Sequence, residues 1–125
     1  MKASEVQIGG GHYKKLPFQP AELFAKTRCT AFQANIWKYI SRYKYKDGAR
    51  DIKKCMHCAQ LAQEYQCGGM LGQRERSFVN LFCDINKLSE RQAKIMRYAS
   101  FDSYSGVIRE CTELLKEEYP QEAEL

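Results

Sequence analysis

The sequence predicts an all-α protein, a small helical domain built on a helical hairpin at about residues 30–67 with further C-terminal helices. Three observations carry this prediction. Apolar residues recur at helical spacing in four segments, two segments open with a capping-box pattern, and no stretch of convincing length alternates apolar and polar residues. With 125 residues, of which 44% are hydrophobic and 28% charged, the chain suits one globular domain and excludes a two-domain enzyme.

The first two helices are predicted from their N-terminal residues. Pro20 suits the first turn of a helix, where its missing N–H costs nothing, so a short helix is expected over residues 20–26. Thr30 and Gln33 have the spacing of a capping box, in which each side chain satisfies an orphaned backbone N–H. A second helix is therefore expected to begin there and to run to about Tyr45.

A tight turn should join the second helix to the third. The segment Lys46-Asp47-Gly48 has the composition of a turn, so the third helix is expected to begin near Ala49. It should end at Cys67-Gly68-Gly69, where glycine can take the left-handed conformation that closes a helix. Two consecutive helices around a tight turn predict a hairpin.

The second half of the chain shows the same signals. A fourth helix is predicted from four residues at helical spacing, namely Phe78, Leu81, Phe82 and Ile85. A capping box at Ser89 and Gln92 predicts the start of the next. A last amphipathic helix, capped by Asp102, is predicted from Val107, Ile108, Cys111, Leu114 and Leu115. Pro120 should stop it, and residues 120–125 are expected to form a frayed acidic tail.

Charge is distributed unevenly along the chain. Residues 1–54 hold twelve Lys and Arg against four Asp and Glu, a net charge of +8, whereas residues 55–125 hold eight against eleven, a net charge of −3. A positive potential is expected where the cations of the first half cluster, and the simplest partner for such a cluster is an anionic ligand.

Helical phasing groups these cations. On the second helix one arc, expected to be buried, holds Phe32, Ile36, Tyr39, Ile40 and Tyr43, and a neighbouring polar arc holds Asn35, Lys38, Arg42 and Lys46. On the third helix the expected buried face is Ile52, Cys55, Ala59 and Ala62, and the polar face is Arg50, Lys53, His57 and Gln60. If the buried faces meet, two basic edges flank one groove that could hold a phosphate or a carboxylate. The alternative is a solvated basic surface.

Three other patterns have ordinary explanations. The glycines at 9–11 before His12 could hold a phosphate on backbone N–H groups, or could be a flexible terminus, and they do not form a P-loop. The segment Cys55-Met56-His57-Cys58 suggests zinc, but core thiols are the simpler explanation. Glu110, Glu113 and Glu117 are spaced to chelate magnesium, or to form a solvated helix face. No metal site is therefore assigned.

A family resemblance adds to this interpretation. Five ordered segments between residues 9 and 65 resemble the SaV-like bacteriophage family, namely His12-Tyr13-Lys14, the helix start at Pro20, Asn35 to Arg42, Lys46-Asp47-Gly48 and Asp51 to Lys54. The family includes a coliphage nucleotide kinase, which phosphorylates deoxynucleoside monophosphates without a Walker motif, and a lactococcal phage protein that sensitises its host to abortive infection. This chain has Ala34 where the family usually has glycine, lacks the kinase's cysteine-rich segment, and has no match over residues 70–125.

The resemblance implies a site and a function. It points to His12, Tyr13, Asn35, Lys38, Tyr39, Arg42, Lys46, Asp51 and Lys54. In a phosphoryl-transfer enzyme acting on deoxynucleoside monophosphates, the four cations of this set would clamp phosphates. Asn35 and Tyr39 would contact the base or sugar, and Asp51 or His12 would orient the accepting oxygen. ATP or another nucleoside triphosphate would be the donor, and the need for magnesium stays open.

Two alternatives keep the basic surface without the reaction. The first is a non-catalytic phage protein that binds a nucleotide or a host defence protein, and the second, ranked last, is nucleic-acid binding through Tyr39, Tyr43 and Tyr45. We expect a homo-oligomer with sites assembled between subunits. The absence of an apolar leader or a long apolar run predicts a cytoplasmic protein with no membrane partner. The family resemblance implies that this is the cytoplasm of the bacterial host.

Overall fold

The computed structural model of the chain describes residues 2 and 16–123. The described residues form helices and no strand, which confirms the all-α prediction. The helices are α1 (Pro20–Thr27), α2 (Ala31–Arg42), the 3₁₀ helix η3 (Tyr43–Tyr45), α3 (Ala49–Glu64), α4 (Gln73–Ile85), α5 (Glu90–Ser100) and α6 (Tyr104–Glu118). None of them has both the length and the apolar character that crossing a bilayer requires.

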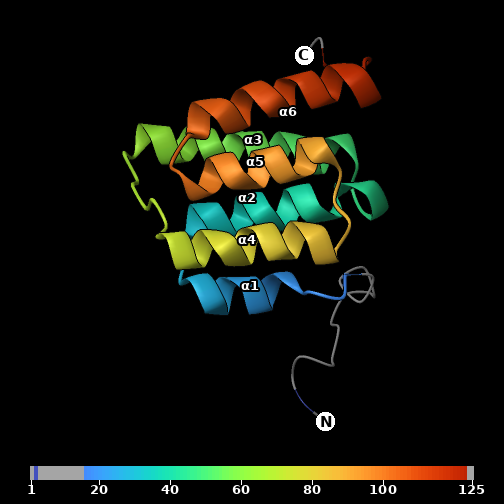
Figure 1. Cartoon of the computed structure of the whole chain (residues 1–125). Helices are drawn as coiled ribbons and strands as arrows, with labels where there is room; N and C mark the ends of the chain where they lie inside the picture. Colours follow the sequence, from blue (N-terminus) through green and yellow to red (C-terminus); the bar gives the residue numbers. More distant parts are fainter. Residues whose placement is uncertain (1, 3–15, 124–125) are drawn as a thin grey trace.

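The helices pack in two layers (Figure 1). α4 and α5 lie side by side in front, and α2 and α3 form a hairpin behind them. α6 covers α3 and α5 at one end of the bundle, and α1 covers α4 and α2 at the other. Helix α2 therefore has neighbours on several sides, whereas α4 packs mainly against α1 and α5.

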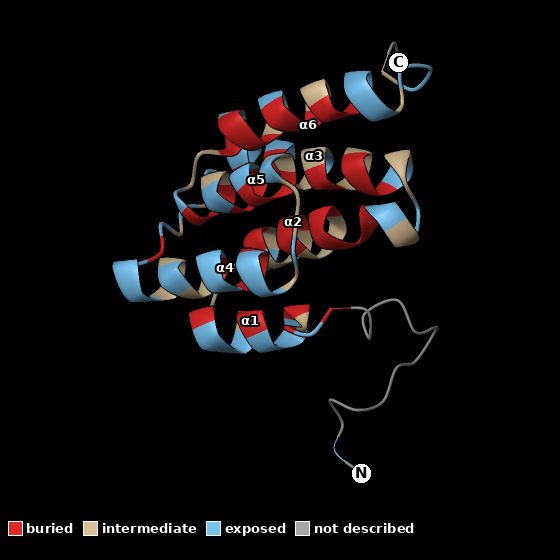
Figure 2. Cartoon of the chain, turned by 45° about the vertical axis from the view of Figure 1, so that its right-hand side comes forward, coloured by how far each residue is buried: buried red, intermediate tan, exposed pale blue. Residues whose placement is uncertain are grey.

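The core follows from these contacts. Each helix turns a buried stripe inward and an exposed face outward (Figure 2). On α3 the buried residues Ile52, Cys55, Ala59 and Ala62 are those that phasing predicted, joined by Asp51. On α2 the prediction is confirmed for Ile36, Ile40 and Tyr43, while Phe32 and Tyr39 are half-buried.

Trp37 is the largest fully buried side chain, and its position was not predicted. It is enclosed because α2 contacts both α3 and α5, so that more than one stripe of α2 is covered. The indole Nε1 donates to the carbonyl of Met96 on α5 at 3.1 Å, which satisfies the one polar group of this side chain.

Both predicted capping boxes are present. Thr30 and Gln33 begin α2, and Ser89 and Gln92 begin α5, each pair with reciprocal hydrogen bonds. The amide groups also join helices, because Gln33 Nε2 donates to Gly69 at 2.7 Å and to Ala99 at 3.0 Å. Gln92 Nε2 donates to the carbonyl of Ile40 at 2.8 Å. These two residues therefore fix the ends of helices that are distant in sequence.

Several boundaries differ from the prediction. The α-helix of α2 ends at Arg42, and the predicted last turn is the separate 3₁₀ helix η3. α3 ends at Glu64, and the left-handed residue after it is Gln66, with φ of 52°, rather than a glycine. Its backbone turn is closed by the N–H of Cys67, which donates to the carbonyl of Ala62 at 2.9 Å.

The start and the end of α6 also differ. Ser103, not Asp102, is the N-cap residue of α6, and it makes no capping hydrogen bond through its side chain. Asp102 has φ of 60°, so it forms part of the turn instead. After Glu118 the described residues 120–123 form a turn, and Glu122 pairs with Lys53 on α3 at 2.6 Å, a contact that was not predicted.

Candidate functional site

The hairpin of α2 and α3 gathers cations around Tyr39. Lys38 Nζ lies 5.0 Å from the centre of the Tyr39 ring, the guanidinium carbon of Arg42 lies at 5.0 Å, and Lys54 Nζ lies at 5.5 Å. Cations at such distances are attracted to the face of an aromatic ring, which offsets part of their mutual repulsion. Three of the predicted phosphate-binding residues therefore converge on the predicted stacking residue.

Arg42 and Asp51 hold the two helices together beneath this cluster. Arg42 Nε donates to one oxygen of Asp51 at 3.2 Å and Nη2 donates to the other at 3.1 Å. The Asp51 side chain has no exposed surface, and only 8% of the Arg42 side chain is exposed. Asp51 also accepts the backbone N–H of Asp47 at 3.2 Å, which fixes the turn between the helices.

This pairing changes the roles expected for both residues. A carboxylate with no exposed surface has no access to a ligand hydroxyl in this conformation, so the orienting role suggested for Asp51 lacks a geometric basis here. Arg42 directs two of its nitrogens to Asp51 and lies over the Tyr39 ring. Both residues are therefore placed to position the surface above them rather than to bind on it.

A shallow pocket of about 360 Å³ opens beside the cation cluster. Tyr39 forms one wall, and α3 supplies the rest with Arg50, Lys53, Lys54, His57 and Cys58. Four of its six lining residues carry a positive charge or an imidazole, and no carboxylate lines it. A pocket of this size and charge suits a small anionic ligand with an apolar or aromatic part.

Electrostatics at Lys38 show how close the cations are. Partial burial lowers the pKa of Lys38 most, and the charge of Arg42 lowers it further, with smaller effects in the same direction from Lys54 and Lys46. The nearby Cys58 acts in the opposite direction. A bound anion would relieve this repulsion, so the cluster is arranged to gain from binding one.

The other predicted site residues have varied positions. Asn35 is half-buried on α2 and does not line the pocket, and Lys46 is exposed in the turn after η3. His12 and Tyr13 lie outside the described residues. The family resemblance did not point to the pocket residues Arg50, Lys53, His57 and Cys58, although phasing had placed three of them on the polar face of α3.

Within the described residues the cysteines are not gathered into a metal-binding group. Cys55 is fully buried, and its Sγ lies 3.7 Å from the Sγ of Cys111 on α6. Burial raises the pKa of Cys55 well above its usual value, and the hydrogen bond with Cys111 adds to this effect. Across residues 16–123 no group of three or more His, Cys, Asp or Glu side chains is placed to hold a metal ion. Cys55 is a core thiol.

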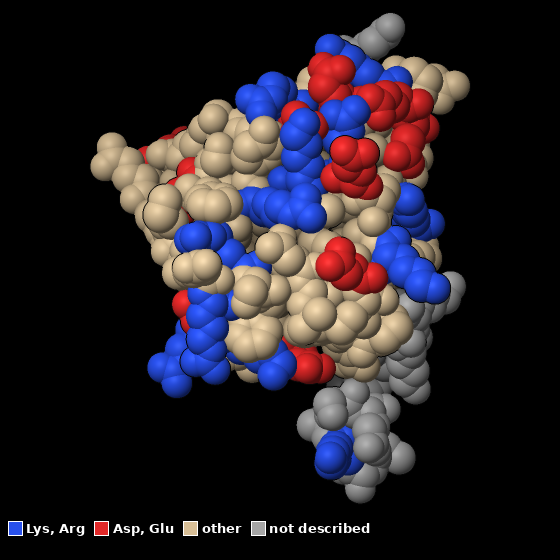
Figure 3. Space-filling model, viewed as in Figure 1, with Lys and Arg blue, Asp and Glu red and all other residues tan. Residues whose placement is uncertain are grey.

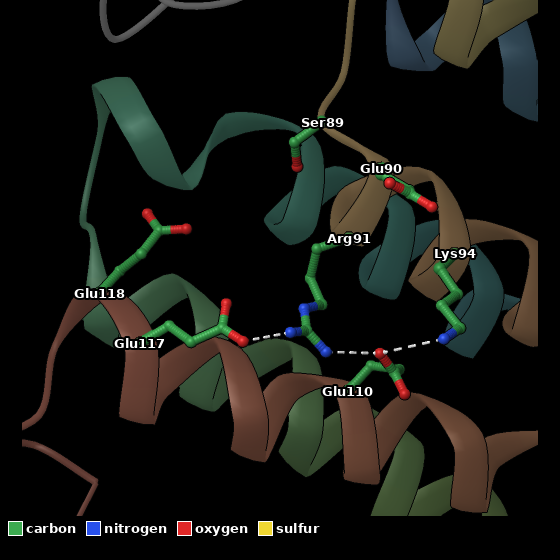
Figure 4. Close-up of a pocket in the computed structure, with 7 residues that line it drawn as sticks. All are labelled: Ser89, Glu90, Arg91, Lys94, Glu110, Glu117 and Glu118. Atoms are coloured by element: carbon green, nitrogen blue, oxygen red, sulfur yellow. Dashed lines mark hydrogen bonds and ion pairs between the residues drawn. The ribbon is translucent and has the colours of Figure 1, made fainter.

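The face seen in Figure 3 carries mixed charges over α5 and α6. There Glu110 is only 5% exposed and lies between cations. Arg91 Nη1 donates to it at 2.7 Å, Arg109 Nε at 3.3 Å, and Lys94 Nζ lies at 3.7 Å. The Arg91 guanidinium also reaches Glu117 (Figure 4). Glu110 and Glu117, two of the three glutamates with the spacing of a chelating group, are thus paired with protein cations, and the third, Glu113, pairs with Lys116.

The comparisons leave the family open. No protein-family model, no curated protein and no solved structure matches this chain.

Proposed function

We propose that the surface formed by Tyr39 and the cations of α2 and α3, here called the Tyr39 pocket, binds a nucleotide through its phosphate. The observation that carries the proposal is the convergence of Lys38, Arg42 and Lys54 on one aromatic ring. Lysine ammonium groups would neutralise the phosphate charge, and the partly exposed Tyr39 ring would stack on the base or contact the sugar.

The pocket residues of α3 extend this interpretation. Arg50 and His57 add donors to the lining of the pocket, which also includes Lys53, the partner of Glu122. Arginine can contact a phosphate through two parallel hydrogen bonds, and the exposed Arg50 has that geometry available to it. A mononucleotide fits this site better than a long nucleic acid, because Tyr43 is buried and the Tyr45 hydroxyl donates to the carbonyl of Ser41.

Phosphoryl transfer to a deoxynucleoside monophosphate is the catalytic form of the same proposal. It needs a second bound nucleotide as donor and a group that orients the accepting oxygen. With Asp51 buried, the candidate for this orienting role is His57, whose imidazole is exposed and lines the pocket. Non-catalytic nucleotide binding requires no such group, and the geometry of the pocket supports it better.

Calorimetric titration with deoxynucleoside monophosphates tests binding. We expect saturable binding of the monophosphates and no binding of the corresponding nucleosides, which lack the phosphate. In Lys54→Ala the affinity for the monophosphates should be at least tenfold weaker. Lys116→Ala, which removes an exposed lysine from α6, is the matched control and should bind as the wild type does. Equal affinity for a monophosphate and for its nucleoside would contradict the proposal.

Incubation with labelled ATP and each monophosphate separates the two forms of the proposal. A labelled diphosphate that disappears in His57→Gln would support phosphoryl transfer. Saturable binding with no diphosphate formed would leave a nucleotide-binding protein.

A further inference from the structure

Helix α4 exposes a continuous apolar stripe. Leu81 is 46% exposed and Ile85 42% exposed, and Phe78 is half-buried beside them. Their positions, at intervals of three and four residues, place them on one side of the helix. The neighbouring side of α4, with Val79, Phe82 and Cys83, is buried towards α1 and α5. Leu81 and Ile85 are therefore turned towards solvent, whereas Phe78 packs against the edge of the core.

The two ends of the stripe carry opposite charges. Arg74 stands in the first turn of α4 and Asp84 in the last, so about 15 Å separates them along the helix at 1.5 Å per residue. Lys26 from α1 strengthens the positive end, because its Nζ lies 5.3 Å from the centre of the Phe78 ring, and the Arg74 guanidinium lies 5.9 Å from the same ring. In the described part of the chain neither Arg74 nor Asp84 forms an ion pair.

This pattern is complementary to itself. In an antiparallel pair of α4 helices related by a two-fold axis, Phe78 of each copy meets Leu81 of the other. Arg74 then comes next to Asp84 of the second copy, and it does so twice because the contact is symmetric. In the view of Figure 3 a largely tan area crosses α4 and α1, with blue atoms gathered at its left edge. The apolar centre and the charged ends are thus both matched in an antiparallel pair of α4 helices.

We propose that the α4 stripe is a self-association surface, and that its partner is a second copy of this chain in antiparallel orientation. Arg74 and Asp84 are placed so that each can pair with the other across a two-fold axis. This arrangement favours a second copy of the chain as partner, because binding of an unrelated protein would not require it. A single helix face about 20 Å long and about 10 Å wide buries less than the usual 800 Å² per partner, so the dimer is weak and depends on concentration.

This surface is separate from the Tyr39 pocket. The pocket is lined by α2 and α3, whereas the stripe belongs to α4, which packs against α1 and α5. The dimer therefore leaves each pocket complete within one chain, unlike the shared site expected from the sequence. Failure of this proposal would leave the nucleotide proposal standing, and the reverse also holds.

Sedimentation equilibrium on the full chain, over a roughly hundredfold range of concentration, tests the proposal. The average mass should rise with concentration from 14.5 kDa towards twice that value. In Leu81→Glu, which sets two carboxylates near each other at the interface, the dissociation constant should rise at least tenfold. Met70→Glu is the control, because Met70 is 64% exposed and lies in the loop before α4, outside the stripe.

A charge exchange tests the orientation. Arg74→Glu and Asp84→Arg should each weaken the dimer, because each places like charges together twice. Both substitutions in one chain should restore its dissociation constant to within about threefold of the wild type. A wild type that stays at 14.5 kDa throughout, or a double variant as weak as the single ones, would overturn the proposal. Circular dichroism of each variant checks that the fold is retained.

Discussion

The guanidinium of Arg42 forms two hydrogen bonds with the carboxylate of Asp51, and this pair joins α2 to α3 with almost no exposed surface. The two residues are nine positions apart, on either side of η3 and the turn at Gly48. The turn itself is tied to the pair, because the N–H of Asp47 also donates to Asp51. The pair thus sets the separation of the helices that carry the Tyr39 pocket.

Substitution of Arg42 by alanine should therefore destabilise the fold. The change leaves a buried carboxylate without its cation, which typically costs about 3–5 kcal/mol. Urea denaturation measures this loss, and the exposed Arg50→Ala serves as control with a change within about 0.5 kcal/mol. Arg42→Ala combined with Asp51→Ala should recover part of the loss. An Arg42→Ala variant of unchanged stability would contradict the structural role.

Local signals made much of the fold predictable. A capping box needs only residues three positions apart, and both were identified correctly from Thr30 and Ser89. The buried face of α3 was also correct, because it follows from helical periodicity alone. Trp37 was missed because its burial depends on how many helices surround α2, and that number is not encoded in the periodicity of one segment.

The candidate site shows the same limit. Phasing placed Arg42 and Lys38 on the same polar arc. The two side chains are indeed close, because the charge of Arg42 lowers the pKa of Lys38. It could not show that Arg42 turns towards Asp51, because this depends on the geometry of η3 and the turn that follows it. The pocket wall from α3 was likewise visible as a polar face, but only the fold brings it against Tyr39.

The six cysteines should react in two groups. Cys55, Cys83 and Cys111 are buried, whereas Cys29, Cys58 and Cys67 are partly exposed. Burial raises the pKa of Cys83 to about 11, which further lowers the fraction of reactive thiolate. Iodoacetamide under native conditions should label only the second group, and unfolding in urea should expose all six. Peptide mass spectrometry identifies the labelled residues, and early native labelling of Cys55 would contradict its burial.

Gly106 allows α6 to approach α5 closely. A Cβ atom at this position would lie 2.7 Å from the Tyr98 ring, closer than carbon atoms can pack. Helix propensity alone would make Gly106→Ala stabilising by about 1 kcal/mol. We expect the clash with Tyr98 to outweigh this gain, so that the free energy of unfolding falls by about 1–3 kcal/mol. Thermal unfolding measures it, with the exposed Ser105→Ala as control. A higher melting temperature in Gly106→Ala would show that Tyr98 moves aside at little cost.

The cations around Glu110 should make stability depend on pH. Burial by itself raises the pKa of Glu110, but the hydrogen bonds from Arg91 and Arg109 and the charge of Lys94 together lower it below its ordinary value of 4.5. A group whose pKa is lower in the folded state contributes stability above its ordinary pKa. That contribution is lost as the pH falls through the folded-state pKa, because both states are then protonated.

Glu110→Gln should therefore cost stability at neutral pH and little in acid. At pH 7 the variant should lose about 2 kcal/mol, since it removes the negative charge that accepts the hydrogen bonds from Arg91 and Arg109. The difference from the wild type should begin to shrink as the pH falls below 4.5, where the unfolded carboxylate is protonated, and should disappear below the lower folded-state pKa, where the folded carboxylate is protonated too. Urea denaturation across this pH range measures the difference, with Glu113→Gln on the same helix as control, since Glu113 is nearly half-exposed. If the difference in unfolding free energy between the wild type and Glu110→Gln stayed constant from pH 7 into acid, the shape of Glu110 and not its charge would stabilise the junction of α5 and α6.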